Sequence, residues 1–243
     1  MTWEVTPWTM SLAVLIVWMV IVLGGEILQA GGATSLEGLV SKHFVYSLAV
    51  APLFLLAVIA YAGWWREVGL QFEGRINNLK VLVVPGLAVI VIWAIAFSRG
   101  LSWGRTLIVV GANTLLVGCS EELMFRGILF YGSQSSFGFR WAVVITAAIF
   151  GLSHALNGLI TGKPKRAFEQ AFFATLFGFW MAALRVHLDT IIPLIVIHWL
   201  WDFGLSAAAP VNAASVKAAP IKNMLPVACE IIPFAYGLWL LYG

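Results

Sequence analysis

The sequence predicts an all-α membrane protein, a polytopic bundle of about eight transmembrane helices. The 243 residues are 61% hydrophobic and only 10% charged, and their mean hydropathy is +0.95. A soluble domain carries about 25% charged residues. The apolar residues also gather in long runs that short polar connections separate. Low charge, high hydropathy and long apolar runs together exclude an ordinary soluble domain.

Each run is close to the length of about 20 mostly apolar residues that a transmembrane helix needs. The runs lie near residues 8–28, 43–64, 79–98, 104–131, 140–160, 167–186, 190–208 and 223–242. The run 104–131 exceeds one bilayer, so we expect part of "EELMFRGILFY" to kink or to lie along the interface. No connection could hold a second domain, and we expect residues 1–243 to form a single integral membrane domain.

The charged residues of the connections indicate that the chain contacts a lipid bilayer and not a nucleic acid. The net charge is only +3, and the basic residues are scattered, so no nucleic-acid footprint is present. Basic residues divide 6 to 8 between the two sets of alternate connections, a margin that leaves the membrane orientation open. The first run has no basic region before it, and we expect a span rather than a removable signal peptide. Cys119 and Cys229 lie in apolar runs and are expected to be buried thiols.

Ionisable residues inside the apolar runs are the informative ones. Such a residue near the bilayer centre costs about 2.5–3.5 kcal/mol on insertion scales and usually lines a cavity or a pathway. The set comprises Glu26, Glu121, Glu122, Arg126, His154, Glu169, His198, Asp202 and Glu230.

The stretch "CSEELMFRG" holds three of them. Glu122 and Arg126 are four residues apart, so they share a helix face and can form an ion pair. Glu121 is rotated by about 100° from Glu122. We therefore expect Glu121 to face a hydrated cavity without an ion-pair partner, where it could act as a general base. The alternative is that this helix end lies at the interface and that water solvates all three side chains.

Two downstream stretches carry the histidines. His154 lies in "FGLSHALN", within an apolar run, and His198 and Asp202 lie four residues apart in "IHWLWDFG". Taken alone, His154 could be a hydrogen-bonded core residue, and the His198–Asp202 pair could join two helices. Taken together with "CSEELMFRG", these residues predict one polar pocket, since each would be costly if it were buried separately.

Two chemistries fit such a pocket. A carboxylate can activate water while histidines move the proton and stabilise an oxyanion. Alternatively, Glu and His side chains can hold a divalent metal such as zinc, which lowers the pKa of its bound water. The spacing is not H-E-x-x-H, which argues against a zincin-like helix but leaves open a metal held by separate helices.

The ordered set "EELMFR", "FGLSH" and "HWLWD" resembles the CAAX protease and bacteriocin-processing (CPBP, or Abi) family of intramembrane glutamate-dependent endopeptidases. The family pattern is E-E-x-x-x-R, then F-x-x-x-H, then H-x-x-x-N or H-x-x-x-D, each on a separate transmembrane helix. The resemblance covers residues 104–208. The matching positions are Glu121, Glu122, Arg126, Phe150, His154, His198 and Asp202.

The resemblance implies catalytic roles for four of these residues. Glu121 would be the general base for the attacking water, and His154 would position that water or move its proton. His198 and Asp202 would line the oxyanion side. The prenyl-endopeptidase branch has Asn where this chain has Asp202, and an ionised Asp cannot donate a hydrogen bond. We therefore expect Asp202 to orient His198.

The remaining positions receive supporting roles or none. The resemblance implies that Glu122, Arg126 and Phe150 shape the site. It implies no resident cofactor, and a metal-free mechanism is favoured over a zinc-dependent one. It assigns no role to Glu26, Glu169 or Glu230.

The expected function is therefore an intramembrane peptidase. Its partner would be a membrane-associated protein or peptide, processed in the manner of a CAAX tail or of a leader or sorting peptide. The expected location is the plasma membrane of a prokaryote. One alternative is a non-catalytic membrane protein of bacteriocin self-immunity or partner-binding type. Another is a small transporter with a proton relay, which the lack of an inverted repeat disfavours.

Overall fold

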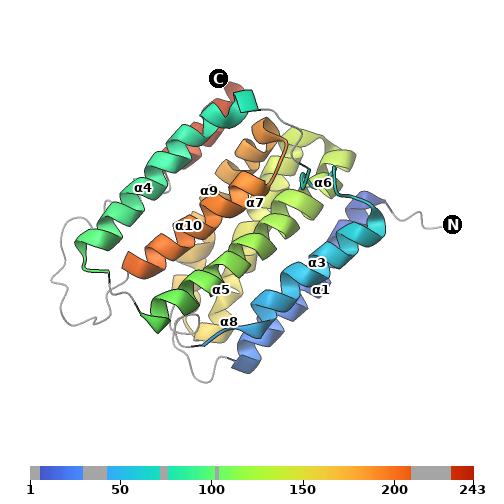
Figure 1. Cartoon of the computed structure of the whole chain (residues 1–243). Helices are drawn as coiled ribbons and strands as arrows, with labels where there is room; N and C mark the ends of the chain where they lie inside the picture. Colours follow the sequence, from blue (N-terminus) through green and yellow to red (C-terminus); the bar gives the residue numbers. More distant parts are fainter. Residues whose placement is uncertain (1–5, 30–42, 72–75, 102–103, 209–230) are drawn as a thin grey trace.

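The fold is a bundle of helices with no strand among the described residues (Figure 1). The computed structural model describes residues 6–29, 43–71, 76–101, 104–208 and 231–243. The elements are α1 (Pro7–Gln29), α3 (Tyr46–Ala62), η1 (Ile76–Leu82), α4 (Val83–Ser98), α5 (Arg105–Glu121), η2 (Glu122–Leu129), α6 (Phe130–Phe137), α7 (Phe139–Ala155), α8 (Asn157–Thr161), α9 (Pro164–Leu188), α10 (Ile192–Ala208) and α12 (Ile232–Tyr242). The all-α prediction is confirmed.

Five helices are long and apolar enough to cross a bilayer, and three shorter apolar helices accompany them. The five are Pro7–Gln29, Asn78–Ser98, Arg105–Phe137, Phe139–Thr161 and Pro164–Leu188. The shorter ones are Tyr46–Ala62, Ile192–Ala207 and Ile232–Tyr242. Each coincides with an expected run, although much of the run 223–242 lies outside the described residues. The chain is an integral, multi-pass membrane protein.

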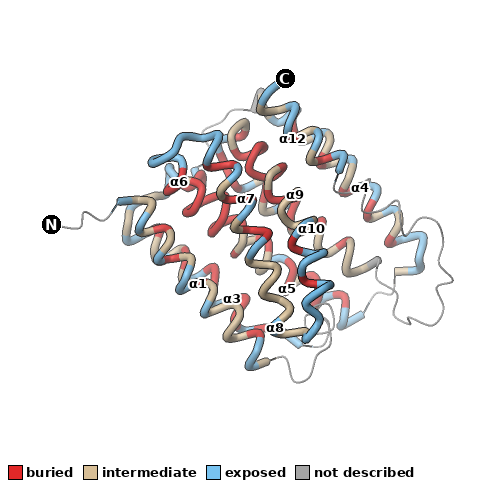
Figure 2. Tube along the Cα trace, turned by 180° about the vertical axis from the view of Figure 1, so that it is seen from behind, coloured by how far each residue is buried: buried red, intermediate tan, exposed pale blue. Residues whose placement is uncertain are grey.

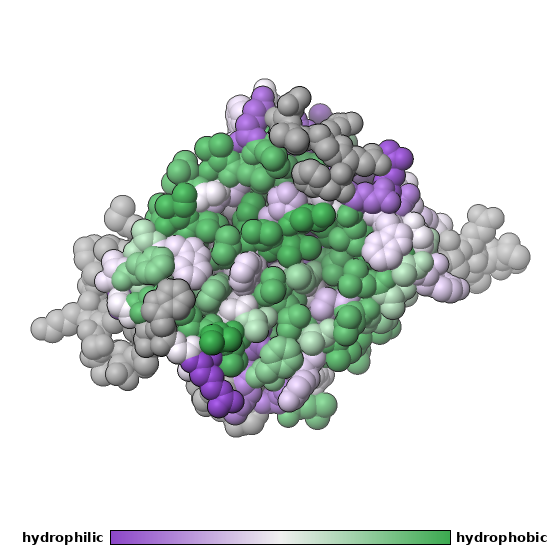
Figure 3. Space-filling model, in the orientation of Figure 1, coloured by the Kyte–Doolittle hydropathy of each residue, from purple (hydrophilic) through white to green (hydrophobic). Residues whose placement is uncertain are grey.

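Apolar side chains cover the outside of the bundle. Ile16, Leu53 and Ile108 are each at least 66% exposed. In Figure 3 hydrophobic residues fill the middle of the visible face, and hydrophilic residues gather at its upper and lower edges. A protein surrounded by water rarely exposes so much apolar surface, whereas the lipid tails of a bilayer solvate such a surface.

Burial is concentrated in the central helices (Figure 2). In α9, 56% of the most apolar window is buried, against 22% in α1. Every residue of η2 is buried. The centre of the bundle is therefore built around η2 and its neighbours, which carry most of the ionisable residues singled out above.

The long helix Arg105–Phe137 contains a π-helical segment at its middle. α5 ends at Glu121, η2 is a π-helix over Glu122–Leu129, and α6 continues from Phe130. A π-helix replaces the i→i−4 hydrogen bonds by i→i−5 bonds and is often found at functional sites. The expected irregularity in "EELMFRGILFY" is thus a π-helical insertion, and its first residue is Glu122.

Helices α7 and α9 approach closely because glycines lie at their contact. A Cβ on Gly151 would meet the Thr175 hydroxyl and lie 2.7 Å from the carbonyl oxygen of Ala171. A Cβ on Gly178 would lie 3.1 Å from the ring of Phe150. Small residues of this kind let membrane helices pack backbone to backbone. The close packing holds Phe150 and His154 of α7 at a fixed distance from α9.

We predict that Gly151→Ala lowers the free energy of unfolding by about 1–3 kcal/mol, because the added methyl group forces α7 away from α9. Gly24→Ala is the matched control, since nothing lies within 4 Å of a Cβ added to that helical glycine. Thermal unfolding in detergent measures both variants. Equal melting temperatures for Gly151→Ala and the wild type would contradict the close packing of α7 on α9.

Candidate active site

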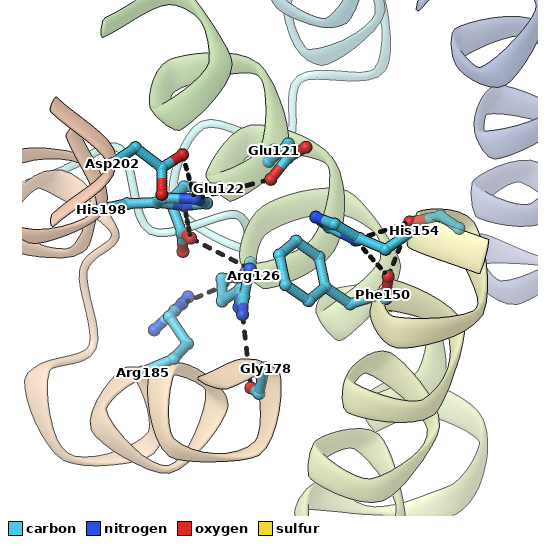
Figure 4. A network of polar contacts seen from close by, with 10 residues as sticks. Glu121, Glu122, Arg126, Phe150, His154, Gly178, Arg185, His198 and Asp202 are labelled. Atoms are coloured by element: carbon cyan, nitrogen blue, oxygen red, sulfur yellow. Dashed lines mark hydrogen bonds and ion pairs between the residues drawn. The ribbon is translucent and has the colours of Figure 1, made fainter. Parts of the chain in front are cut away.

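Four elements bring the residues of the three sequence stretches together (Figure 4). Glu121 ends α5 and Glu122 begins η2. His154 lies in the last turn of α7. His198 and Asp202 come from α10. The expected convergence on one polar region is therefore present in the structure.

The imidazole of His198 lies between the two adjacent glutamates. Its Nδ1 is 2.7 Å from Oε1 of Glu122, and its Nε2 is 3.5 Å from Oε2 of Glu121. Nε2 is also 3.4 Å from Oδ2 of Asp202. We expected Glu121 to have no ion-pair partner, and this was wrong. One ring can contact both carboxylates because its two nitrogens point in different directions.

The buried end of this cluster is an ion pair within η2. A guanidinium nitrogen of Arg126 donates to Oε1 of Glu122 at 3.0 Å, and both side chains are essentially inaccessible, at 1% and 0%. The same guanidinium donates to the carbonyl oxygen of Gly178 at 3.4 Å. Its carbon lies 4.3 Å from the centre of the Phe150 ring. Glu122 and Arg126 are therefore sealed inside the bundle, with the aromatic face of Phe150 beside the cation.

His154 is oriented by the backbone of its own helix. Its Nδ1 lies 2.8 Å from the carbonyl oxygen of Phe150, so Nδ1 donates and Nε2 is the free nitrogen. In Figure 4 Nε2 turns toward the side on which Glu121 lies. No hydrogen bond directly joins these two described side chains. They face each other across space that a water molecule or a substrate group could occupy.

A cavity of about 330 Å³ runs beside these residues. Glu121, His154 and Asp202 line it, whereas Glu122 and His198 do not. The side chains of Glu121 and Asp202 are 16% and 34% exposed. The two neighbouring glutamates therefore have different environments: Glu121 borders the cavity, and Glu122 is closed off from it.

Arg185 of α9 is a buried residue that the sequence did not single out. It donates to the carbonyl oxygens of Arg126 and Glu67 at 3.3 and 3.1 Å. It also forms an ion pair with Asp189 at 3.3 Å. Arg185 thus ties η2 to α9 and to the segment after α3. Its position inside an apolar run was the available signal.

A second such contact comes from α1. The indole nitrogen of Trp18 donates to the hydroxyl of Ser120 at 2.7 Å, and both groups are buried. Because Ser120 precedes Glu121, this bond sets the height of α1 against the end of α5. A tryptophan in the middle of an apolar run carries no sequence signal that distinguishes it from a lipid-facing one.

The other ionisable residues are dispersed. Glu169 is exposed on α9, and Glu26 is buried and lines the cavity. Glu230 and Cys229 lie outside the described residues, and Cys119 is a half-buried free thiol.

Among the described residues, no group of three or more His, Cys, Asp or Glu side chains has an arrangement suited to a metal ion. The described carboxylates and histidines fit proton transfer and hydrogen bonding.

Comparison with known proteins agrees with the geometry. Residues 102–204 match the family model described as type II CAAX prenyl endopeptidase Rce1-like. The match confirms the resemblance to the CAAX protease and bacteriocin-processing family, a family of CAAX-type peptidases, and it covers every residue of the cluster around His198. No curated protein and no solved structure matches the chain.

We predict that Arg126→Met lowers the free energy of unfolding by about 3–5 kcal/mol, because it leaves the buried Glu122 carboxylate without its cation. Arg140→Met is the matched control, because Arg140 is exposed at the start of α7. It should change stability by less than about 1 kcal/mol. Thermal unfolding in detergent measures the loss, and a double Glu122→Gln/Arg126→Met variant shows how much of it comes from the interaction between Glu122 and Arg126. Equal losses for Arg126→Met and Arg140→Met would show that the buried pair does not hold η2.

Proposed function

We propose that this chain is an intramembrane endopeptidase in which Glu121 activates a water molecule to hydrolyse a peptide bond of a membrane-associated protein or peptide. One observation carries the proposal: of the two adjacent glutamates, only Glu121 lines the cavity, and it faces His154 there while contacting His198. A general base must reach both water and substrate, and Glu122 reaches neither.

The reaction begins with water between Glu121 and His154. The Glu121 carboxylate accepts a proton as the water oxygen bonds to the carbonyl carbon of the peptide. The C–N bond then breaks, and the proton passes from Glu121 to the leaving nitrogen. The products are a new carboxylate and a new amine. His154, whose Nδ1 is held by the Phe150 carbonyl, presents Nε2 as an acceptor that orients the water.

His198 serves the oxyanion side. Both of its ring nitrogens face carboxylate oxygens, an arrangement that a doubly protonated imidazolium satisfies. His198 does not line the cavity, so its positive charge acts through Glu121 and Asp202, which do, and lowers the cost of the negative charge that develops on the carbonyl oxygen. Glu122, at 2.7 Å, fixes the ring more closely than Asp202 does at 3.4 Å. Orientation of His198 is therefore assigned mainly to Glu122, with Asp202 in a supporting position.

The substrate class follows from the site's place in the membrane. The cavity lies within the helix bundle, so a peptide must be held in or at the bilayer to enter it. The family description names prenyl endopeptidases, and a CAAX-type tail or a leader or sorting peptide fits the same requirement. The proposed location is the plasma membrane of a prokaryote, and the proposed chemistry uses no resident metal.

We predict that Glu121→Gln lowers kcat/KM by about 100- to 10,000-fold, because an amide cannot accept the proton of the water. The assay is cleavage of a lipid-anchored peptide by protein in nanodiscs, with products identified by mass spectrometry. Glu169→Gln is the matched control, since Glu169 is an exposed carboxylate outside the cavity. Cleavage by Glu121→Gln at the wild-type rate would rule out the proposed base. A wild-type cleavage rate in His154→Ala would rule out a water molecule held between Glu121 and His154.

We predict that Asp202→Asn retains activity within about tenfold of the wild type, since Asn keeps an oxygen acceptor for His198. Its added N–H group can also donate toward the oxyanion side. The measurement is kcat/KM in the same assay. A loss as large as that of Glu121→Gln would make the Asp202 charge itself part of the catalytic machinery.

A further inference from the structure

Glu26 is a buried carboxylate that the proposed mechanism does not use. It lies on α1, three residues before the helix ends at Gln29, and it is 9% exposed. It makes no hydrogen bond or ion pair with any described residue, and it lines the same cavity as Glu121, His154 and Asp202. Buried carboxylates are normally paired, so one in a cavity wall that has no partner among the described residues marks a place for a group that arrives from outside.

The charge of the cavity indicates the sign of that group. Its lining includes the carboxyl groups of Glu26, Glu121 and Asp202, and no lysine or arginine among the described residues. A cavity with walls of low dielectric constant concentrates the field of such groups and attracts cations.

The surroundings of Glu26 indicate the shape of the group. The lining residues near it on the same helix are Met19, Val22 and Leu23, and Leu48 and Leu205 add further apolar wall. Lysine and arginine carry a cationic head on an apolar stem and cover apolar surface with that stem. A basic side chain therefore matches a carboxylate set in an apolar wall.

The position of Glu26 along α1 gives its distance from Glu121, where the peptide bond is proposed to be cut. Trp18 marks the level of Glu121, because its indole donates to the neighbouring Ser120. Glu26 is eight residues further along the helix, about 12 Å at 1.5 Å per residue. An extended peptide covers that distance in about three to four residues. Allowing for the length of a basic side chain, the site corresponds to a residue about two to four positions from the bond that is cut.

We propose that Glu26 is a specificity-determining residue that binds a lysine or arginine of the substrate two to four residues from the scissile bond. This inference rests on the proposed peptidase function for its meaning, but the binding of the basic side chain can be measured without cleavage. In this proposal the peptide bond is cut at the Glu121 end of the cavity, and a basic side chain of the substrate is bound at the Glu26 end.

The experiment uses lipid-anchored peptides that differ at one position, with lysine, norleucine or glutamate placed in turn along the sequence. Affinity for the full-length protein in nanodiscs is measured by fluorescence, and cleavage is measured by mass spectrometry. We expect the wild type to bind the best-placed lysine peptide about tenfold more tightly than its norleucine counterpart. In Glu26→Gln this ratio should fall to about one, and Glu26→Asp should retain part of it. Glu169→Gln is the control for an exposed carboxylate and should keep the wild-type ratio.

Each outcome decides one of the two proposals. A wild-type ratio near one, or a ratio that Glu26→Gln leaves unchanged in a protein with wild-type melting behaviour, overturns the recognition role of Glu26. Charge-dependent binding without cleavage of any peptide supports the role of Glu26 and contradicts the peptidase. Cleavage without any preference for lysine supports the peptidase and contradicts the role of Glu26.

Discussion

The Glu122 carboxylate is the point on which the arrangement of the site depends. Its Oε1 accepts hydrogen bonds from Arg126 at 3.0 Å and from His198 at 2.7 Å, with no exposure to solvent. Arg126 in turn contacts the Gly178 carbonyl and the Phe150 ring. One carboxylate thereby joins η2 to α7, α9 and α10. Oε2 of Glu122 is buried with no hydrogen-bond partner among the described residues, so the two contacts at Oε1 alone balance the cost of burying this carboxylate.

Because Glu122 holds Arg126 and His198, the neighbouring Glu121 is not needed for these contacts within the bundle. Glu121 sits at the other nitrogen of the same imidazole, but its side chain borders the cavity. Two consecutive residues can have such different environments because neighbouring side chains of a helix point about 100° apart. The buried Glu122 holds the histidine, and the proposed mechanism uses Glu121, which borders the cavity. Glu26 is a second carboxylate in the cavity wall, on α1 and away from Glu121.

Much of this could be predicted from the sequence. Apolar runs located the helices, and the i, i+4 spacing predicted the Glu122–Arg126 pair. The cost of buried ionisable residues predicted that these side chains would gather in one polar region, in which Glu121 and His154 line the cavity and His198 does not. These predictions succeed because they depend on local spacing and on solvation, which a sequence contains directly.

The remainder depends on packing between helices that are distant in the chain. Nothing in "EELMFRGIL" announces a π-helix, and without it Glu121 was expected to have no partner rather than to contact His198. Arg185 was not singled out because it lies near the expected end of its run, and the ends of membrane helices are uncertain by several residues. Glu26 was recognised as costly, but its place in the cavity wall follows from how α1 packs against α3, α6 and η2, and from the Trp18–Ser120 bond.

The central claim is that water, activated by Glu121, attacks the peptide bond directly. Single-turnover cleavage of a lipid-anchored peptide in ¹⁸O-labelled water, followed by mass spectrometry of the product and of the Glu121-containing fragment, tests it most directly. The account predicts one ¹⁸O atom in the new carboxylate of the product and none in Glu121. Label in the Glu121 carboxylate, or a peptide covalently attached to it, would contradict the account by making Glu121 a nucleophile.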